Sequence, residues 1–377
     1  IKIFELNEKI PEKYMQLKRI QNSFLNCYFD NKKTESSFKK LIGNKESGYS
    51  RYIYFLTNYF QSKGNTNDIE NLLTKNKDEN NSSLLMAQTE DFFLRKKNKE
   101  ILNFFSCKNP TDVIAEIFYL IANLYSTDEN YQLSNFYLKI SLFLNKKFTP
   151  NKTLLAENLY RQKKYKSSKT FYNLVKKIGP IYSWYASKNI ALILLKTESK
   201  ESSIASLEKE FQQLENPNYQ HYFEMANIYK DNQYYEKSIK YYSFALKKIK
   251  NNDPLSAKIL ERRGTSYDSL GDWDKAEMDL KNSLKILPNQ AYALNYLAYT
   301  WIDKKINIEK ALQMLETATQ LKENDGYIID SLGWAHYRNK NYIDAAKFLQ
   351  RAVELMPLDP VINDHYGDAL WMLKKNI

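Results

Sequence analysis

Three histidines and two cysteines are the side chains in this sequence from which metal or acid–base chemistry could be built. His365 stands three residues before Asp368, so a helix would place both on one face, but two ligands fall short of a structural zinc site. His221 lies next to tyrosines. We interpret His365 and Asp368 as solvated polar side chains and His221 as a surface or packing residue, and we predict no metal site.

The cysteines and the short motifs give no sign of catalysis. Cys27 and Cys107 are flanked by aromatic and apolar residues and are too few for a disulfide framework, so we interpret both as small hydrophobes. Gly43 and Gly48 lack the following Lys-Ser/Thr of a phosphate-binding loop, and no Gly-x-Ser-x-Gly motif occurs. The sequence therefore predicts a protein that is not an enzyme and binds no cofactor.

Composition limits the class of fold. The chain has 377 residues, 43% of them hydrophobic, but only nine glycines and nine prolines, too few for a strand-and-turn protein of this length. Mean hydropathy is −0.62, and no uncharged apolar run approaches the length that spans a bilayer. The composition predicts a helical chain without a membrane span in this segment.

Positive charge is the one unusual feature of the composition. The formal net charge is +12, and the densest basic run falls within residues 146–177, where Glu157 is the only acidic residue. Such clusters can neutralise phosphates, but lysine far outnumbers arginine, the residue suited to bidentate phosphate contacts. A nucleic-acid or anionic-surface site is thus the alternative hypothesis, with nucleic acid unfavoured. Its candidate residues are Lys152, Arg161, Lys163, Lys164, Lys166, Lys169, Lys176 and Lys177.

A repeat of about 34 residues is clearest near the C-terminus. Small residues recur at two positions of the repeat, first at Gly264, Ala298 and Gly333, and then at Ala276, Ala311 and Ala345. The intervening pattern, as in Leu260-x-x-Arg263-Gly264-x-x-Tyr267, resembles the tetratricopeptide repeat, a pair of antiparallel helices. His336 occupies the slot of Tyr267 and Trp301 in sister repeats, so we interpret it as a core ring.

The same register extends towards the N-terminus with weaker matches. The paired anchors are Ala122 with Ser134, Ala156 with Ser168, Ala191 with Ser203, and Ala226 with Ser238. We divide the chain into irregular repeats over 1–110, divergent repeats over 111–254 and well-formed repeats over 255–377. The last helix, near 363–373, has no second helix after it, and we expect a truncated rather than a natural end.

Packing explains why such a pattern folds. Small residues let the two helices of a pair approach closely, and large apolar residues at helical spacing face the neighbouring repeat. No pair can bury its own apolar stripe alone, so stability comes from stacking. Pro288 and Pro357 mark the ends of second helices. The predicted fold is an all-α solenoid of stacked antiparallel helix pairs, the tetratricopeptide superhelix.

In such a superhelix the first helix of each pair lines the concave surface, which is where a partner would bind. Aromatic rings there offer rigid contact area, and carboxylates favour a basic or amine-bearing partner. The combination of lysine and asparagine that holds C-terminal carboxylates in some members of the family is absent from these slots. The predicted groove residues are Tyr292, Asn295, Tyr299, Tyr327, Asp330, Trp334, Tyr337, Asp364, Asp368 and Trp371.

A narrower resemblance concerns the segment Asp330-Ser-Leu-Gly-Trp-Ala-His-Tyr-Arg338 and the run from Ile362 to Trp371. Both are similar to the C-terminal repeats of proteobacterial exported tetratricopeptide-repeat lipoproteins, which serve as protease adaptors and scaffolds. That resemblance implies a periplasmic or outer-membrane-anchored adaptor, with a lipid anchor upstream of Ile1; a cytoplasmic location stays open. The predicted function is a non-catalytic scaffold that binds a protein or peptide partner.

Overall fold

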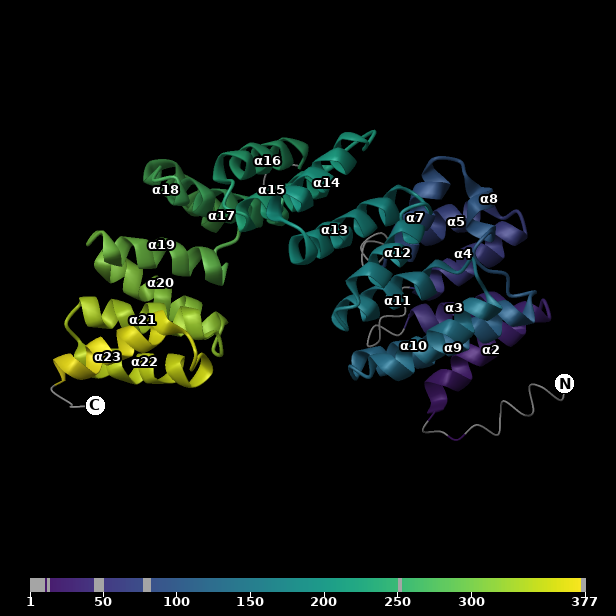
Figure 1. The fold of residues 1–377 in the computed structure, drawn as a ribbon, viewed down its shortest axis with the longest axis horizontal. Coiled ribbons are helices and arrows are strands. Elements are labelled where there is room, and N and C mark those ends of the chain that lie inside the picture. The colour runs from purple at the N-terminus through teal and green to yellow at the C-terminus, as the bar shows by residue number, and fades with distance from the viewer. Residues whose placement is uncertain (1–10, 12–13, 44–50, 77–82, 250–252, 374–377) are drawn as a thin grey trace. The chain divides into compact units, whose positions relative to one another are not determined.

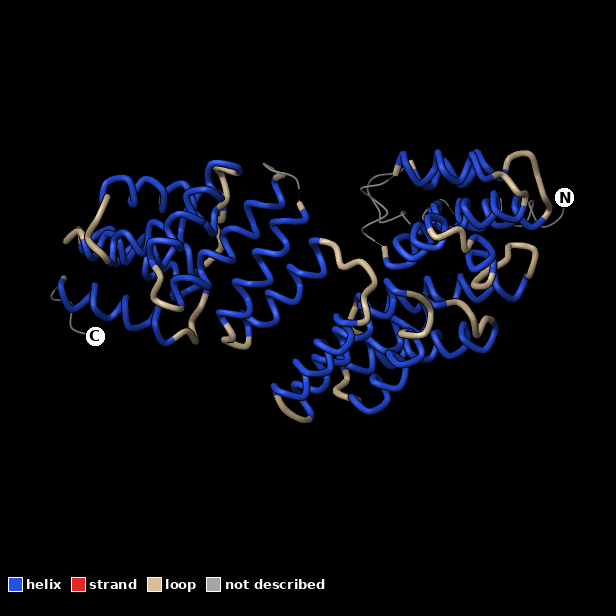
Figure 2. The backbone as a smooth tube through the Cα atoms, turned by 90° about the horizontal axis from the view of Figure 1, so that it is seen from above, coloured by secondary structure: helices blue, strands red, loops and turns tan. Residues whose placement is uncertain are grey.

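The computed structural model describes residue 11 and residues 14–43, 51–76, 83–249 and 253–373. Every regular element in these ranges is an α-helix (Figures 1 and 2). The chain forms two compact units, 1–214 and 215–377, which are described separately below. The prediction of an all-α solenoid of antiparallel helix pairs is confirmed. The predicted boundaries at 110 and 254 concern the regularity of the repeats and stay predictions.

The N-terminal unit consists of six helix pairs among its described residues. In each pair the two helices are joined by a short turn, and the second helix runs back along the first. The helices are α2 (Met15–Tyr28), α3 (Thr34–Ile42), α4 (Arg51–Ser62), α5 (Thr66–Lys75), α7 (Leu84–Leu94), α8 (Asn98–Leu102), α9 (Pro110–Thr127), α10 (Tyr131–Leu144), α11 (Thr149–Arg161), α12 (Tyr165–Val175), α13 (Pro180–Thr197) and α14 (Lys200–Gln212).

The C-terminal unit has four helix pairs and a final first helix among its described residues. Second helices α18 and α22 end just before Pro288 and Pro357, as predicted. The helices are α15 (Tyr219–Asp231), α16 (Tyr235–Lys248), α17 (Pro254–Ser269), α18 (Trp273–Ile286), α19 (Ala291–Asp303), α20 (Ile308–Leu321), α21 (Gly326–Arg338), α22 (Tyr342–Leu355) and α23 (Pro360–Met372).

The small-residue anchors meet inside each pair. In the N-terminal unit a buried serine on the second helix donates to the backbone carbonyl of the alanine on the first helix. The bonds run from Ser134 to Ala122 at 2.7 Å, from Ser168 to Ala156 at 2.8 Å and from Ser203 to Ala191 at 2.7 Å. These three anchor pairs, which the sequence register matched, are therefore in contact. We call this close contact between the two helices of a pair the seam.

Glycine occupies the same seam in the C-terminal unit. A Cβ atom added at Gly333 would lie 2.7 Å from Leu349 Cγ, and one at Gly264 would lie 3.1 Å from the Ala276 carbonyl. Such distances are too short for ordinary van der Waals contact. Helices α21 and α22, and likewise α17 and α18, thus approach more closely than an alanine would allow.

One turn geometry joins the two helices of most pairs. A residue with positive φ follows the first helix, and the next amide donates to the carbonyl five residues earlier, the bond pattern of a Schellman motif. Three of these turns lie before residue 110, where the small-residue register is blurred, so the helix-pair architecture continues there. The positive-φ residues are Asp30, Gly64, Lys96, Glu129, Lys163, Gln233, Gly271, Lys305 and Lys340.

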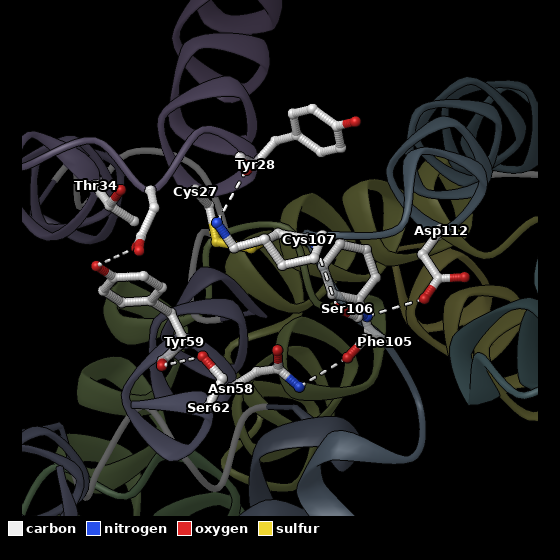
Figure 3. Close-up of a disulfide and its surroundings, with 12 residues drawn as sticks. Cys27, Tyr28, Thr34, Asn58, Tyr59, Ser62, Phe105, Ser106, Cys107 and Asp112 are labelled. Carbon is white, nitrogen blue, oxygen red and sulfur yellow. Dashed lines mark hydrogen bonds between the residues drawn. A yellow bond between two sulfur atoms is a disulfide. The ribbon is translucent and has the colours of Figure 1, made fainter. Parts of the chain in front are cut away.

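A disulfide joins Cys27 at the end of α2 to Cys107 before α9, with 5.9 Å between their Cα atoms (Figure 3). The interpretation of these cysteines as free small hydrophobes is wrong, although both side chains are buried. Their separation of 80 residues hid the pair from sequence reasoning. The bond closes a long loop, so it removes more conformational freedom from the unfolded chain than a short-range disulfide would.

The segment around the disulfide is held by further side chains. Asn58 on α4 donates to the carbonyl of Phe105 at 2.9 Å (Figure 3). Asn145 donates to the carbonyl of Phe104 at 2.9 Å. The Phe105 ring lies in the aromatic core of the unit, 5.6 Å from Phe24 between ring centroids. This segment therefore connects three helix pairs of the unit.

The N-terminal unit also brings α7 against α13, which are separated by two helix pairs in sequence. The Gln88 side-chain oxygen accepts from the backbone amide of Ile181 at 3.1 Å, at the start of α13. A Cβ atom at Gly179 would lie 2.4 Å from Gln88 Cδ, so this approach requires glycine. As a result, first helices α4, α7, α9, α11 and α13 all contribute residues to one cavity, described below.

Candidate functional site

The predicted groove lies on the first helices α19, α21 and α23 of the C-terminal unit, a surface that we call the C-terminal first-helix face. Tyr292, Tyr327 and Trp371 present the largest apolar area there, with 53%, 56% and 78% of their surface exposed. Asp364 and Asp368 are exposed as well. These five predicted residues are accessible to a partner.

Two of the exposed tyrosines are fixed by the capping residues of the next repeat. Tyr292 Oη donates to Asp325 Oδ2 at 3.0 Å, and Tyr327 Oη donates to Asp359 Oδ2 at 3.2 Å. Asp325 and Asp359 also accept from the first backbone amides of α21 and α23 as helix caps. The hydrogen bond to the carboxylate raises the pKa of each tyrosine. The rings are thus held in defined positions beside an open depression of about 590 Å³ that both help to line.

Asp330 and His365 form a buried pair between α21 and α23. Their exposed fractions are 7% and 8%, and the imidazole Nδ1 lies 3.0 Å from Asp330 Oδ1. The Trp334 ring stacks on His365 at 4.0 Å between centroids and on Tyr337 at 4.8 Å. The interpretation of His365 as a solvated residue is wrong, because Asp330 and Trp334 enclose it. Asp330 holds an internal partner and does not offer a free carboxylate.

The other predicted groove residues are intermediate in exposure. Tyr299, Tyr337 and Trp334 are half-buried. Asn295 is half-buried too, and its Oδ1 is buried without a hydrogen-bond partner. His336 is half-buried and stacks on Phe348 at 5.4 Å, which fits its interpretation as a packing ring. Nothing in the structure tests which of these residues contact a partner, so the groove assignment stays a prediction.

The basic run of the sequence is spread over α11, the following turn and α12. Lys169 pairs with Glu198 at 3.5 Å, and Lys176 pairs with Glu210 on α14. Burial lowers the pKa of Lys152. Lys163, Lys164, Lys166, Lys177 and Arg161 are exposed. Internal partners therefore take up part of the positive charge that the sequence displays.

Sequence reasoning missed two adjoining cavities on the first helices of the N-terminal unit. The first, about 490 Å³, is lined by Arg51, Tyr119, Glu157 and Tyr182 among others. The second, about 500 Å³, shares Glu157 and is walled by tyrosines of α11 and α13. Glu157 is the only acidic residue in the basic run, and that contrast was the signal that could have singled it out.

A buried ion pair lies beside the first cavity. Arg51 Nη2 donates to Glu116 Oε2 at 2.7 Å, and the Arg51 guanidinium lies 4.2 Å from the centre of the Tyr119 ring. Glu116 is fully buried, and its Oε1 has no hydrogen-bond partner. Burial raises the pKa of Glu116 to about 7, against the lowering effect of Arg51. Arg51 thus enters the cavity with its guanidinium already bound to Glu116.

Comparisons with known proteins agree with the repeat architecture. No protein-family model matches the chain. A TPR repeat-containing protein of Pseudomonas aeruginosa is 29% identical over 178 residues, which is 47% of this chain and 29% of that protein. The match therefore spans less than a third of the relative's length. This likeness agrees with the repeated helix pairs of the structure.

Solved tetratricopeptide-repeat structures also resemble parts of the chain. One from Parabacteroides merdae covers 51% of this chain and 74% of its own, at 21% identity and a TM-score of 0.41. YrrB, described as a TPR protein with an unusual peptide-binding site, matches 50% of this chain and 91% of its own, at 18% identity and a TM-score of 0.36.

Among the described residues of the present chain, no helix is long and apolar enough to cross a bilayer.

The Glu116 pair makes the stability of the N-terminal unit depend on pH. Because the folded-state pKa lies above the ordinary value of 4.5, the folded chain binds more protons between those two values, and this contribution to stability falls as pH rises to about 7. Between pH 4.5 and 8, we expect the free energy of unfolding of the wild type to fall by about 3 kcal/mol relative to that of Glu116→Gln. Urea unfolding of both proteins across this range measures the difference. Parallel pH profiles for the two proteins would show that Glu116 titrates normally.

Proposed function

We propose that the protein is a non-catalytic scaffold that binds an extended polypeptide on its C-terminal first-helix face. The observation that carries this proposal is the pair of exposed rings, Tyr292 and Tyr327, each held by an aspartate that caps the next first helix. A ring fixed in advance loses little conformational freedom when a partner binds. Tyrosine also offers apolar area and a polar tip at once, which suits it to protein interfaces.

The polar groups on the same face indicate the chemistry of the partner. Asp364 and Asp368 are exposed on α23 next to Trp371. An acidic rim beside aromatic anchors favours a segment with basic side chains or free amide donors. The nucleic-acid alternative has less support, because Lys169 and Lys176 are paired within the protein.

The double variant Tyr292→Ala/Tyr327→Ala tests this face. Each truncated aromatic anchor removes about 2 kcal/mol or more from the binding free energy of an interface hot spot, so partner capture should fall at least tenfold. Quantitative affinity purification with cross-linking from the native organism measures the loss. The thermal melt should change little, since both rings are largely exposed.

The matched control is Met278→Ala/Ile343→Ala, which truncates exposed apolar residues on the second helices α18 and α22. Capture that survives the tyrosine substitutions, or that is lost equally in the control, would contradict the assignment of the first-helix face.

We also propose that this scaffold is an exported adaptor that works in an oxidising compartment, such as the periplasm, in association with a protease or an envelope-assembly complex. The Cys27–Cys107 disulfide supports the compartment, because such bonds persist outside the reducing cytosol. Its two cysteines are buried within the core of the unit, as expected of a structural rather than a reactive pair.

Rapid alkylation of intact cells tests the compartment. Mass spectrometry of the native protein should show the peptides of Cys27 and Cys107 linked and unalkylated when thiols are blocked before lysis. Full alkylation of both cysteines without prior reduction would place the protein in a reducing compartment. A known cytosolic dithiol protein in the same sample serves as the control for complete blocking.

A further inference from the structure

The second cavity of the N-terminal unit has the composition of a site for a cation. Most of its lining comes from the first helices α9, α11 and α13 and the turn after α9, with Tyr131 of α10 and Tyr172 of α12, and it has a volume of about 500 Å³. Two carboxylates line it, those of Glu129 and Glu157, against one positive charge, that of Arg161. Four tyrosines also line it: Tyr131, Tyr160, Tyr172 and Tyr185. We propose that this cavity binds the lysine or arginine side chain of a polypeptide, with Glu157 as its counter-ion.

Glu157 stands at the centre of this surface. The Tyr185 hydroxyl donates to Oε1 and fixes the carboxylate, whose charge Arg161 on the same helix also influences. The side chain lines both cavities, so a bound group can reach it from either side. Burial raises the pKa of Glu157, which means that its negative charge is poorly solvated and gains from a cation.

The tyrosine rings provide the rest of a cation site. The Tyr172 ring is buried and packs edge-on against the Tyr185 ring, with 6.2 Å between centroids and an interplanar angle of 63°, so it holds the Tyr185 ring in place. Ring faces attract an ammonium or guanidinium group, and the ring bodies offer apolar surface to the methylene stem of the side chain. A carboxylate among tyrosines therefore suits a charged tip on an apolar stem.

Hydrogen bonds of Asn158 hold the helices that line the cavity in place. Asn158, on α11 beside Glu157, is buried and donates to Ser134 Oγ at 2.7 Å and to Asn135 Oδ1 at 3.0 Å. Its own Oδ1 accepts from Ser126 Oγ at 2.6 Å. These bonds tie α9, α10 and α11 together, so the site exists before a ligand arrives and little ordering is needed on binding.

An anionic ligand fits this surface less well. Arg51, the cation of the first cavity, is already bound to Glu116, and an anion in either cavity would face Glu157. The chain as a whole carries +12, so a local excess of carboxylates is a departure from its general charge. The positive net charge repels basic peptides at long range, so any preference for them must come from this local arrangement of carboxylates.

The test compares peptides that differ at one residue. A glycine-serine dodecapeptide with a central lysine, and its norleucine analogue, are titrated by calorimetry against the full chain and its variants. We expect wild type to bind the lysine peptide at least fivefold more tightly than the norleucine peptide. Glu157→Gln, which keeps the size of the side chain and its bond from Tyr185, should abolish that preference.

Two further variants keep the test decisive if Glu157→Gln disturbs the fold. Tyr160→Ala and Glu129→Gln should each weaken the lysine preference by twofold or more. Glu198→Gln, which removes a carboxylate of the same unit that lines neither cavity, should leave it unchanged. Equal affinity of wild type for both peptides, or a preference that persists in Glu157→Gln, would overturn the proposal.

The scaffold proposal and this one can fail separately, because they rest on different units of the chain. A glutamate peptide and free cadaverine complete the set of probes. Tighter binding of the glutamate peptide would overturn the assignment of a cation site. Cadaverine that binds as tightly as the lysine peptide would show that a small amine, and not a polypeptide, is the ligand, and would overturn the polypeptide assignment.

Discussion

The close approach of two helix backbones within each pair is the constraint on which the rest of the structure depends. Along the seam only glycine, alanine or serine fits, as Gly333 against Leu349 and Ser168 against Ala156 show. With the two backbones this close, the large apolar residues of a pair face its neighbours, and stacking buries them. The side of each first helix that contacts neither its partner helix nor the neighbouring pairs is therefore available for binding.

Both candidate surfaces lie mainly on this side of the first helices, but their residues differ. In the C-terminal unit, helix-capping aspartates hold tyrosine rings outwards, so one residue serves both the fold and the surface. In the N-terminal unit, the Gln88 contact with the start of α13 brings five first helices around a cavity, and tyrosines and two carboxylates line the second cavity beside it. The same kind of repeat therefore gives an open aromatic face in one unit and cavities lined by charged and aromatic residues in the other.

The sequence predicted the seam well, because small residues that recur at a fixed helical spacing are required chiefly where two helices pack closely. Ala156 and Ser168 were paired by register and are hydrogen-bonded. Prediction failed where contacts join different repeats. The Cys27–Cys107 disulfide and the Arg51–Glu116 ion pair join residues 80 and 65 positions apart, and Asp330 pairs with His365, 35 positions away, on the next first helix. Periodicity specifies neighbours within a repeat, but such long-range contacts depend on how repeats stack.

The most direct test of the seam compares two glycines that occupy the same position of successive first helices. A Cβ atom at Gly333 would lie 2.7 Å from Leu349, whereas one at Gly367 on α23 meets nothing within 4 Å. Alanine favours a helix by about 1 kcal/mol over glycine, and overpacking costs about 1–3 kcal/mol. Hydrogen exchange of α21, α22 and α23 should show Gly333→Ala destabilising α21 and α22, and Gly367→Ala neutral or stabilising for α23. Equal effects of the two substitutions would contradict the account.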